Sequence, residues 1–231
     1  PRVNIRVCEG DLHLHNLHLR LPFKYGIATM THMPMVFVRV ALEVNGRPPV
    51  LGVAADLLPP KWFTKDPARD VLDEIHEMLD VIETALEIAE GQNAPSVFDL
   101  WLHLHDSQAA WARTEGKPPL LAHLGTSLIE RAVIDAFCRA QAKPFHRAVL
   151  DNDFDLRLGE LHGEHSTSIG RILSLHDAVH HEYEHHCHHF RSHGSGIHGR
   201  LDALLRRKHL QWSLRVGRAD CSKHQRRNKR R

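Results

Sequence analysis

Residues 36–46 read VFVRVALEVNG, and residues 50–55, a few positions later, read VLGVAA. In the first stretch β-branched and apolar side chains alternate with other residues, which is the period of a half-buried strand. Asn45 and Gly46 tolerate positive φ angles, so they predict a tight turn that returns the chain as a second strand over residues 50–55. The fold class follows from what lies on either side of this hairpin.

The residues before the hairpin predict a further strand. Residues 12–21 read LHLHNLHLRL, in which apolar and polar side chains alternate. The alternation slips by one position at Asn16-Leu17, and such a slip predicts a β-bulge. Together the three segments predict a three-stranded antiparallel meander.

After the meander the apolar period changes from two to 3.6 near Asp66. Asp66-Pro67 predicts an N-cap followed by proline at the first helical position, and apolar side chains then recur at helical spacing as far as Gly91. Ser96 and Asp99 have the spacing of a capping box, which predicts a second helix through about Trp111. We interpret the acidic face of the first helix as solvated surface; it comprises Asp70, Asp73, Glu77, Asp80, Glu83, Glu87 and Glu90.

Two more helices are predicted over residues 121–142 and 145–150. Three strands followed by helices in separate blocks predict an α+β domain over residues 1–150, a meander followed by a helical layer. Residues 151–165 are a linker or the start of another domain, and the acidic side chains within them predict a surface turn.

The remaining residues have a different composition. Residues 1–165 hold 16 Lys and Arg against 23 Asp and Glu, a net charge of −7, whereas residues 166–231 hold 14 against 5, a net charge of +9, and 11 of the 22 histidines. A histidine tract over 180–189 and a basic end over 223–231 show no apolar period. We expect residues 166–231 to form an irregular, disordered tail, either a natural histidine-rich extension or a segment translated out of frame.

The chain contains no run of 18 apolar residues and begins with no apolar signal segment, so we expect neither a membrane span nor secretion. Its four cysteines are far apart and form no CxxC pair, which is typical of reduced thiols in the cytoplasm.

Short motifs stand in order along residues 10–160. Residues 22–26 (PFKYG) follow the first strand, Gly52 lies in the third, and residues 130–136 (ERAVIDA) lead to Lys143-Pro144-Phe145. Their order and spacing resemble the enolase superfamily, closest to its mandelate racemase/muconate lactonizing branch. In that family an A-x-x-D helix is followed by a G-x-P turn, and Ala142 here stands where the glycine is usual.

The resemblance implies that residues 1–150 are an N-terminal capping domain that closes over a (β/α) barrel. In the family the barrel holds Mg²⁺ on three carboxylates and uses Lys or His bases to remove a proton α to a carboxylate, as a racemase, dehydratase or cycloisomerase does. The cap contributes substrate selectivity and excludes water. By position, the cap loops here are Phe23–Thr29 and Ala55–Phe63. The candidate contacts to a small carboxylate substrate are Phe23, Lys24, Tyr25, Thr29, Lys61 and Trp62.

The residue types in these loops fit that role. The aromatic side chains would provide apolar walls, and Lys24 and Lys61 could pair with a carboxylate. The alternative is that Phe23 and Trp62 pack the cap against the barrel while both lysines are solvated.

The catalytic half of such an enzyme is not visible in the sequence. Only 81 residues follow Leu150, whereas a barrel takes about 200 to 250. The residues after Leu150 contain no Lys-x-Lys strand and no spaced series of Asp and Glu. We therefore expect this chain to be truncated or frameshifted before the barrel, with no catalytic residue, no metal ligand and no cofactor of its own. The oligomeric state stays open, a homo-oligomer included.

Two other functions compete with this interpretation. A histidine-rich metal-binding protein is one, since His181, His185 and His189 are spaced for one helix face beside Cys187, although no apolar core would hold the site. Non-specific nucleic-acid binding through the basic tail is the other, and it would depend on salt. No motif that reads bases accompanies the tail, so nucleic acid is not a favoured partner.

Overall fold

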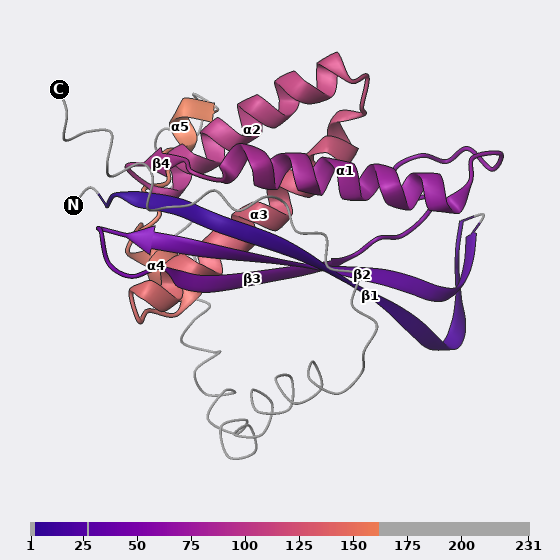
Figure 1. The fold of residues 1–231 in the computed structure, drawn as a ribbon, viewed down its shortest axis with the longest axis horizontal. Coiled ribbons are helices and arrows are strands. Elements are labelled where there is room, and N and C mark those ends of the chain that lie inside the picture. The colour runs from indigo at the N-terminus through magenta and orange to yellow at the C-terminus, as the bar shows by residue number, and fades with distance from the viewer. Residues whose placement is uncertain (1–2, 27, 162–231) are drawn as a thin grey trace. The chain divides into compact units, whose positions relative to one another are not determined.

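The computed structural model describes residues 3–26 and 28–161 (Figure 1). Residues up to Asp155 fall in one compact unit, and Leu156–Gln211 in a second, of which only the start is described. The predicted tail over 166–231, with its histidine tract and basic end, lies outside the described residues. The elements are β1 Ile5–Tyr25, β2 Ala28–Val44, β3 Val50–Leu57, α1 Val71–Ala89, β4 Asn93–Ala94, α2 Val97–Thr114, α3 Pro119–Ala140, α4 Phe145–Leu150 and, in the second unit, α5 Leu158–Leu161.

The predicted α+β class and antiparallel meander are confirmed. The sheet has the order β3-β2-β1-β4, and all its pairings are antiparallel. β1 and β2 pair from Ile5↔Val44 to Tyr25↔Ala28. β4 adds two residues beside the start of β1, and a segment this short gives no periodic signal in the sequence.

The predicted turn at Asn45-Gly46 is also confirmed. The two residues have φ angles of 52° and 72°, which is the pattern of a two-residue type I′ hairpin turn. The Arg47 N–H donates to the Val44 carbonyl at 3.1 Å and closes the turn. The Asn45 side-chain oxygen accepts from the Asn4 N–H at 2.9 Å, so the turn is also tied to the chain just before β1.

The predicted bulge at Asn16-Leu17 is wrong. Asn16 pairs with Pro34 and Leu17 with Met33 in unbroken register, and the shifts lie instead between Val7 and Glu9 and between His18 and Phe23. This part of β1 lies beyond the end of β3, and Leu21 there is 70 % exposed. Because none of the side chains of β1 over residues 16–24 is buried, burial does not force their apolar pattern to follow the pairing.

The predicted N-cap at Asp66 is wrong as well. Asp66 Oδ1 accepts from the Ala68 N–H at 2.9 Å within a turn. The helix begins four residues later, where Asp70 accepts from the Leu72 N–H at 2.7 Å. The carbonyl groups of Asp66 and Arg69 both accept from the Lys61 ammonium, so this stretch folds around that side chain instead of starting the helix.

The core lies between one face of the sheet and the helices α1 and α3. Alternate side chains of β2, from Val36 to Val44, are buried, as the strand period requires. Burying each large apolar side chain stabilises the fold by about 1.5–3 kcal/mol. Facing them on α1 and α3 are Met78, Val81, Ile82, Ala85, Leu128, Ile129 and Ala132.

Gly52 allows α3 to lie directly on β3. A Cβ at this position would be 2.1 Å from the Ala132 carbonyl oxygen and 2.4 Å from the Ala136 nitrogen. A larger side chain would therefore push the helix away from the strand. The small residues on both sides set the distance between the helical layer and the sheet.

Candidate functional site

Two segments far apart in the sequence lie at the same end of the sheet (Figure 1). The first is the hairpin tip, residues 21–29, where β1 ends and β2 begins. The second is the β3–α1 loop, residues 58–70, which leaves β3 just after Leu57 pairs with Met35 of β2. Since neighbouring strands run in opposite directions, the end of β3 and the β1–β2 turn share one end of the sheet.

The hairpin tip carries the first group of predicted contacts. The segment Phe23–Thr29, predicted as a loop, is mostly paired strand: Phe23 pairs with Met30, Lys24 with Thr29 and Tyr25 with Ala28. The Phe23 side chain is 57 % exposed, and those of Lys24 and Thr29 are exposed as well. The strand pairing therefore presents these side chains on a fixed backbone.

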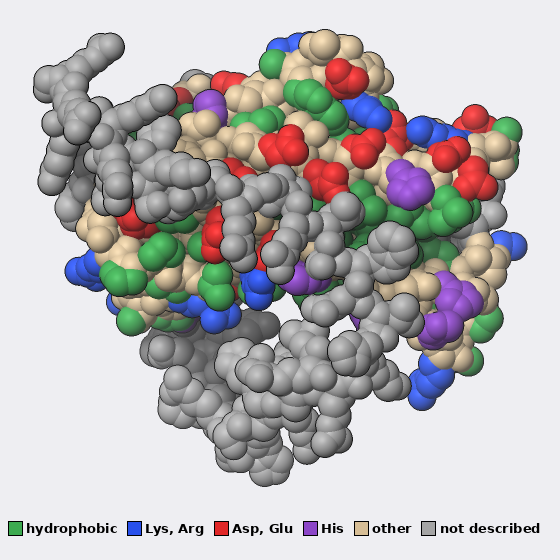
Figure 2. All heavy atoms as spheres, in the orientation of Figure 1, with side chains coloured by type: hydrophobic (Ala, Val, Ile, Leu, Met, Phe, Trp, Pro, Cys, Tyr) green, Lys and Arg blue, Asp and Glu red, His purple; other side chains and the backbone are tan. Residues whose placement is uncertain are grey.

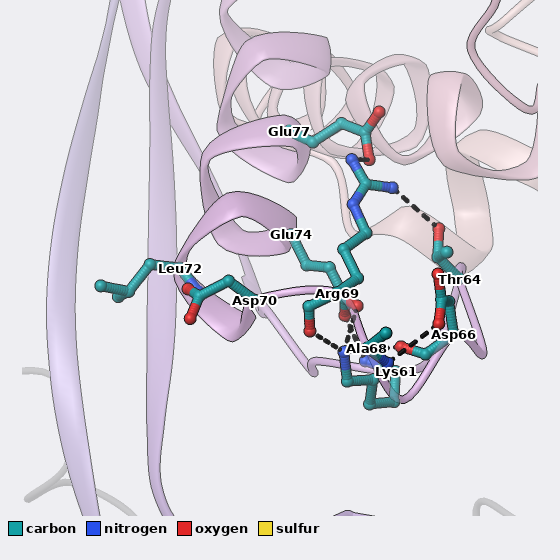
Figure 3. Close-up of polar contacts among 9 residues, drawn as sticks. All are labelled: Lys61, Thr64, Asp66, Ala68, Arg69, Asp70, Leu72, Glu74 and Glu77. Carbon is teal, nitrogen blue, oxygen red and sulfur yellow. Dashed lines mark hydrogen bonds and ion pairs between the residues drawn. The ribbon is translucent and has the colours of Figure 1, made fainter.

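The β3–α1 loop carries the other two predicted contacts, and they differ sharply in burial. The Trp62 side chain is 58 % exposed. The Lys61 side chain is only 9 % exposed, and its ammonium lies 2.6 Å from the Glu74 carboxylate, which is 5 % exposed (Figure 3). Phe23, Lys24 and Trp62 thus have the exposure that a substrate contact needs, and Lys61 does not.

The donors of Lys61 are all used inside the loop. Lys61 Nζ donates to Glu74 Oε1 at 2.6 Å, to the Asp66 carbonyl at 2.9 Å and to the Arg69 carbonyl. An ammonium has three donors, so none is left over in this arrangement. The Lys61 backbone N–H donates to the other Glu74 oxygen at 2.6 Å, and the residue has a φ angle of +63°.

A second group of charges holds the far end of the same loop. Arg69 Nη2 lies 2.8 Å from Glu77 Oε2, and Arg69 Nη1 donates to Thr64 Oγ1 at 3.4 Å (Figure 3). The other Glu77 oxygen lies 3.0 Å from Lys117 Nζ, in the connection between α2 and α3. Glu77 therefore joins the loop to the helical layer.

Sequence reasoning missed both carboxylates. The acidic side of α1 is exposed at Asp73, Asp80 and Glu87, as interpreted, and Figure 2 shows acidic side chains along this helix. Glu77, however, is only 13 % exposed, and it is paired with Arg69 and Lys117. No helical pattern in the sequence relates these two residues to Glu77, so the pairing could not be predicted. Glu74 did carry a signal: it lies four residues before the buried Met78, on the apolar stripe of the helix.

The A-x-x-D motif ties α3 to the edge strand from which the loop departs. Asp135 Oδ2 accepts from the Val53 N–H at 2.9 Å. One turn earlier, the Arg131 guanidinium donates to the Ala55 carbonyl at 3.2 Å and pairs with Asp56 Oδ2 at 2.7 Å. These bonds occupy backbone groups at the open edge of the sheet, where another strand could otherwise add.

The turn after α3 is a Schellman motif with an unusual residue in it. The Ala142 N–H donates to the Arg139 carbonyl and the Lys143 N–H to the Cys138 carbonyl, both at 3.0 Å. Ala142 has a φ angle of +51°, in the left-handed region that usually holds glycine. This is the position of the missing glycine in the motif.

The acidic turn after α4 holds Lys143. Its ammonium lies 2.6 Å from Asp151 Oδ2 and also contacts Asp153. Hydrogen bonding to Asp151 and Asp153 raises the pKa of Lys143, and hydrogen bonding to Lys143 lowers the pKa of Asp151. Asn152 adopts a positive φ of 51°, as expected for the predicted surface turn.

The described residues do not fit the Mg²⁺ that the family resemblance implies. Within residues 3–26 and 28–161, no group of three or more His, Cys, Asp or Glu side chains could hold a metal ion. The carboxylates that are close together, such as Asp151 and Asp153, are paired with a lysine instead. In the same part of the chain, no helix is both long and apolar enough to cross a membrane.

The solved structures similar to this chain include proteins named enolase and mandelate racemase/muconate lactonizing enzyme. An enolase from alpha pretobacterium bal199 with bound Mg has 17 % identity and a TM-score of 0.44, covering 63 % of this chain and 34 % of that chain. An enolase from Bradyrhizobium complexed with magnesium and mandelic acid has 14 % identity and a TM-score of 0.43, covering 63 % and 35 %. A mandelate racemase/muconate lactonizing enzyme-like protein from Rubrobacter xylanophilus has 22 % identity and a TM-score of 0.42, covering 62 % and 33 %.

This chain spans about a third of the length of those enzymes. At these identities the likeness concerns the fold alone. No family model matches the sequence, and no curated protein is significantly similar to it.

Proposed function

We propose that residues 1–150 are the capping domain of an enolase-superfamily enzyme of the mandelate racemase/muconate lactonizing branch. Such an enzyme removes a proton α to a carboxylate with the help of Mg²⁺, as a racemase, dehydratase or cycloisomerase. The observation that carries the proposal is the common position of the hairpin tip and the β3–α1 loop, which expose aromatic and cationic side chains at one end of the sheet. Residues 1–150 alone would be inactive, because the cap supplies neither the bases nor the metal ligands.

The side chains divide into three roles. Phe23, Tyr25 and Trp62 would wall the substrate with apolar surface, and the Lys24 ammonium would pair with its carboxylate. Thr29, opposite Lys24 in the hairpin, would add a hydroxyl group to the same face. Neighbouring side chains of a paired strand alternate between its two faces, so Lys24 and Thr29 would meet the substrate on one face of the hairpin and Phe23 on the other.

Lys61 enters the proposal differently from its interpretation in the sequence. Its three ammonium donors are directed at Glu74 and at two carbonyl groups, so we assign it to the architecture of the loop. The bases and the Mg²⁺ ligands would come from a barrel in the complete enzyme. We place the protein in the cytoplasm, where widely spaced cysteines such as the buried Cys8 and Cys138 stay reduced.

The metal-binding and nucleic-acid alternatives rest on residues that the structure does not describe. Nothing in residues 3–26 and 28–161 favours either: these residues contain no candidate metal cluster. The capping role is therefore the function that the described part of the chain supports best.

A fusion of residues 1–155 to the barrel of a mandelate racemase-type enzyme tests the proposal. We expect Lys24→Gln in the fusion to raise KM for carboxylates roughly tenfold or more, since a charge-assisted hydrogen bond contributes about 1.5–3 kcal/mol. Trp62→Ala should change the order of preference within a panel of carboxylates.

Arg47→Gln is the matched control, because it removes an exposed cation from the turn at the opposite end of the sheet. KM should not respond to it. If the fusion turns over carboxylates and neither Lys24→Gln nor Trp62→Ala alters kcat/KM relative to Arg47→Gln, the assigned cap face is wrong.

A further inference from the structure

The β3–α1 loop is built on a buried ion pair. The Lys61 side chain is 9 % exposed and that of Glu74 5 %. Removing both charges from water is unfavourable unless the geometry satisfies them fully. Here both Glu74 oxygens accept from Lys61, one from the ammonium and one from the backbone N–H, each at 2.6 Å.

The pair controls where the next side chain lies. Lys61 has a φ of +63°, so the chain turns sharply at this residue. Its side chain is buried and directed at Glu74 of α1 (Figure 3). The Trp62 side chain, by contrast, is 58 % exposed. A residue with a Cβ occupies the left-handed region at a cost, and the contacts with Glu74, Asp66 and Arg69 are what hold it there.

The two ends of the loop have different carboxylate partners on α1, although the Arg69 carbonyl also accepts from Lys61 Nζ. Lys61 is anchored to Glu74, and Arg69 is anchored to Glu77, which also binds Lys117. Trp62 follows the first anchor directly and is seven residues from the second. The position of Trp62 should therefore depend on the pair Lys61–Glu74 and much less on Glu77.

We propose that Lys61 and Glu74 are positioning residues that fix the start of the β3–α1 loop on α1 and so hold Trp62 at the exposed end of the sheet. The inference rests on the proposed function in that Trp62 is taken as a wall of the substrate site. Lys61 acts through Trp62 and does not itself contact the substrate.

Three variants of the full chain test this: Glu74→Gln, Lys61→Met and Lys61→Gly. Glu74→Gln keeps the shape of the side chain but removes the charge. Lys61→Gly keeps a backbone that accepts a positive φ but removes the ammonium, so it separates the ion pair from backbone geometry. Asp80→Asn, on the exposed side of α1, and Glu77→Gln, at the other anchor, are the controls.

Two readouts apply to each variant. Amide exchange should become roughly tenfold faster at residues 61–64 in all three variants, while the amides of α3 keep their wild-type rates. Acrylamide quenching of Trp62, isolated by subtracting the spectrum of Trp62→Phe in each background, should rise toward that of a freely exposed indole. Asp80→Asn should change neither quantity, and Glu77→Gln should change both less than Glu74→Gln does, because Arg69 also contacts Thr64 and Lys61.

Wild-type exchange and quenching in Lys61→Gly and Glu74→Gln, with α3 still protected, would overturn the inference, because backbone geometry alone would then place Trp62. Loss of α3 protection in Lys61→Met leaves the other two variants to decide. The experiment contains no substrate, so a cap fusion that fails to select carboxylates would leave its result unchanged.

Discussion

Ala142 closes the Schellman motif after α3 in a conformation that its side chain disfavours, with a φ of +51°. The left-handed region costs an L-residue about 1–2 kcal/mol, and glycine loses about 0.5–1 kcal/mol more in chain entropy on folding. We therefore expect Ala142→Gly to raise the free energy of unfolding by about 0.5–1 kcal/mol, measured by urea denaturation.

Ala110→Gly, on the exposed side of α2, is the control with the opposite sign. It should lower the free energy of unfolding by about 1 kcal/mol, because glycine is a poor helix former. A fall in stability for Ala142→Gly comparable to that of Ala110→Gly would show that the left-handed turn is not formed in solution.

Asp135 accepts from the Val53 N–H at 2.9 Å, and this bond joins α3 to the edge of the sheet. Asp135→Ala removes the acceptor, so we expect a loss of about 1–2 kcal/mol in the free energy of unfolding. Amide exchange at Val53 should become faster in the same variant. Asp135→Asn keeps a side-chain oxygen and should lose less; equal losses for both variants would assign the effect to the ion pair with Arg139.

At the scale of elements, the sequence predicted the strands and helices wherever one face is buried. The buried side chains of β2 alternate, and the sequence shows this period of two. The Asn45-Gly46 turn has the positive φ angles that its residues predict. Ser96 caps α2 as predicted, accepting from the Asp99 N–H at 3.0 Å. The errors lie where burial gives no guidance. The Asn16-Leu17 slip falls in an exposed part of β1, and Asp66 serves a turn built around Lys61.

The packing of α2 on α3 should depend on pH through two histidines. The rings of His105 and His123 are stacked, with centroids 4.4 Å apart and planes at 6°. Burial, and secondarily the charge of His105, lowers the pKa of His123 below its ordinary value. The unfolded chain therefore binds this proton first, so the stability contributed by neutral His123 is full above the unfolded pKa of about 6.5 and is lost as the pH falls through the folded value.

We expect this loss to appear as a difference between wild type and His123→Gln. The free energy of unfolding of the wild type, minus that of the variant, should decrease as the pH falls from 7.5 to 5. The difference is needed because burial raises the pKa of Glu83, Glu90 and Glu130, whose protonation acts in the opposite direction. A difference that is constant over this range would contradict the prediction.

For the whole molecule, the sequence predicted which segments form the candidate site. It did not predict the ion pairs that hold the β3–α1 loop in place. The meander alone places the turn between β1 and β2 and the end of β3 at one end of the sheet. The anchors of the β3–α1 loop join Lys61 to Glu74 and Lys117 to Glu77, and only three-dimensional packing brings these charges together. The sequence around Lys61 gave no sign that its ammonium group is buried.

The chain as a whole should not exchange the α-protons of carboxylates with solvent. Enolisation needs a base within hydrogen-bond reach of the proton and a metal at the developing enolate. The described part of the chain offers no cluster for a metal, and of the two lysines predicted to contact substrate Lys61 is held by Glu74 and two carbonyl groups. Lys24 is exposed on the hairpin tip.

The measurement is deuterium incorporation into a panel of sugar acids and other carboxylates in deuterated solvent with Mg²⁺. We expect incorporation no higher than in protein-free samples. Incorporation that a chelator abolishes would show that residues beyond 161 supply both base and metal ligands. The gene gives a companion test of the out-of-frame hypothesis: reading another frame past about codon 166 should reveal a Lys-x-Lys strand and spaced carboxylates. If no frame contains them while incorporation is absent, a binding or structural role explains this chain better than a detached cap does.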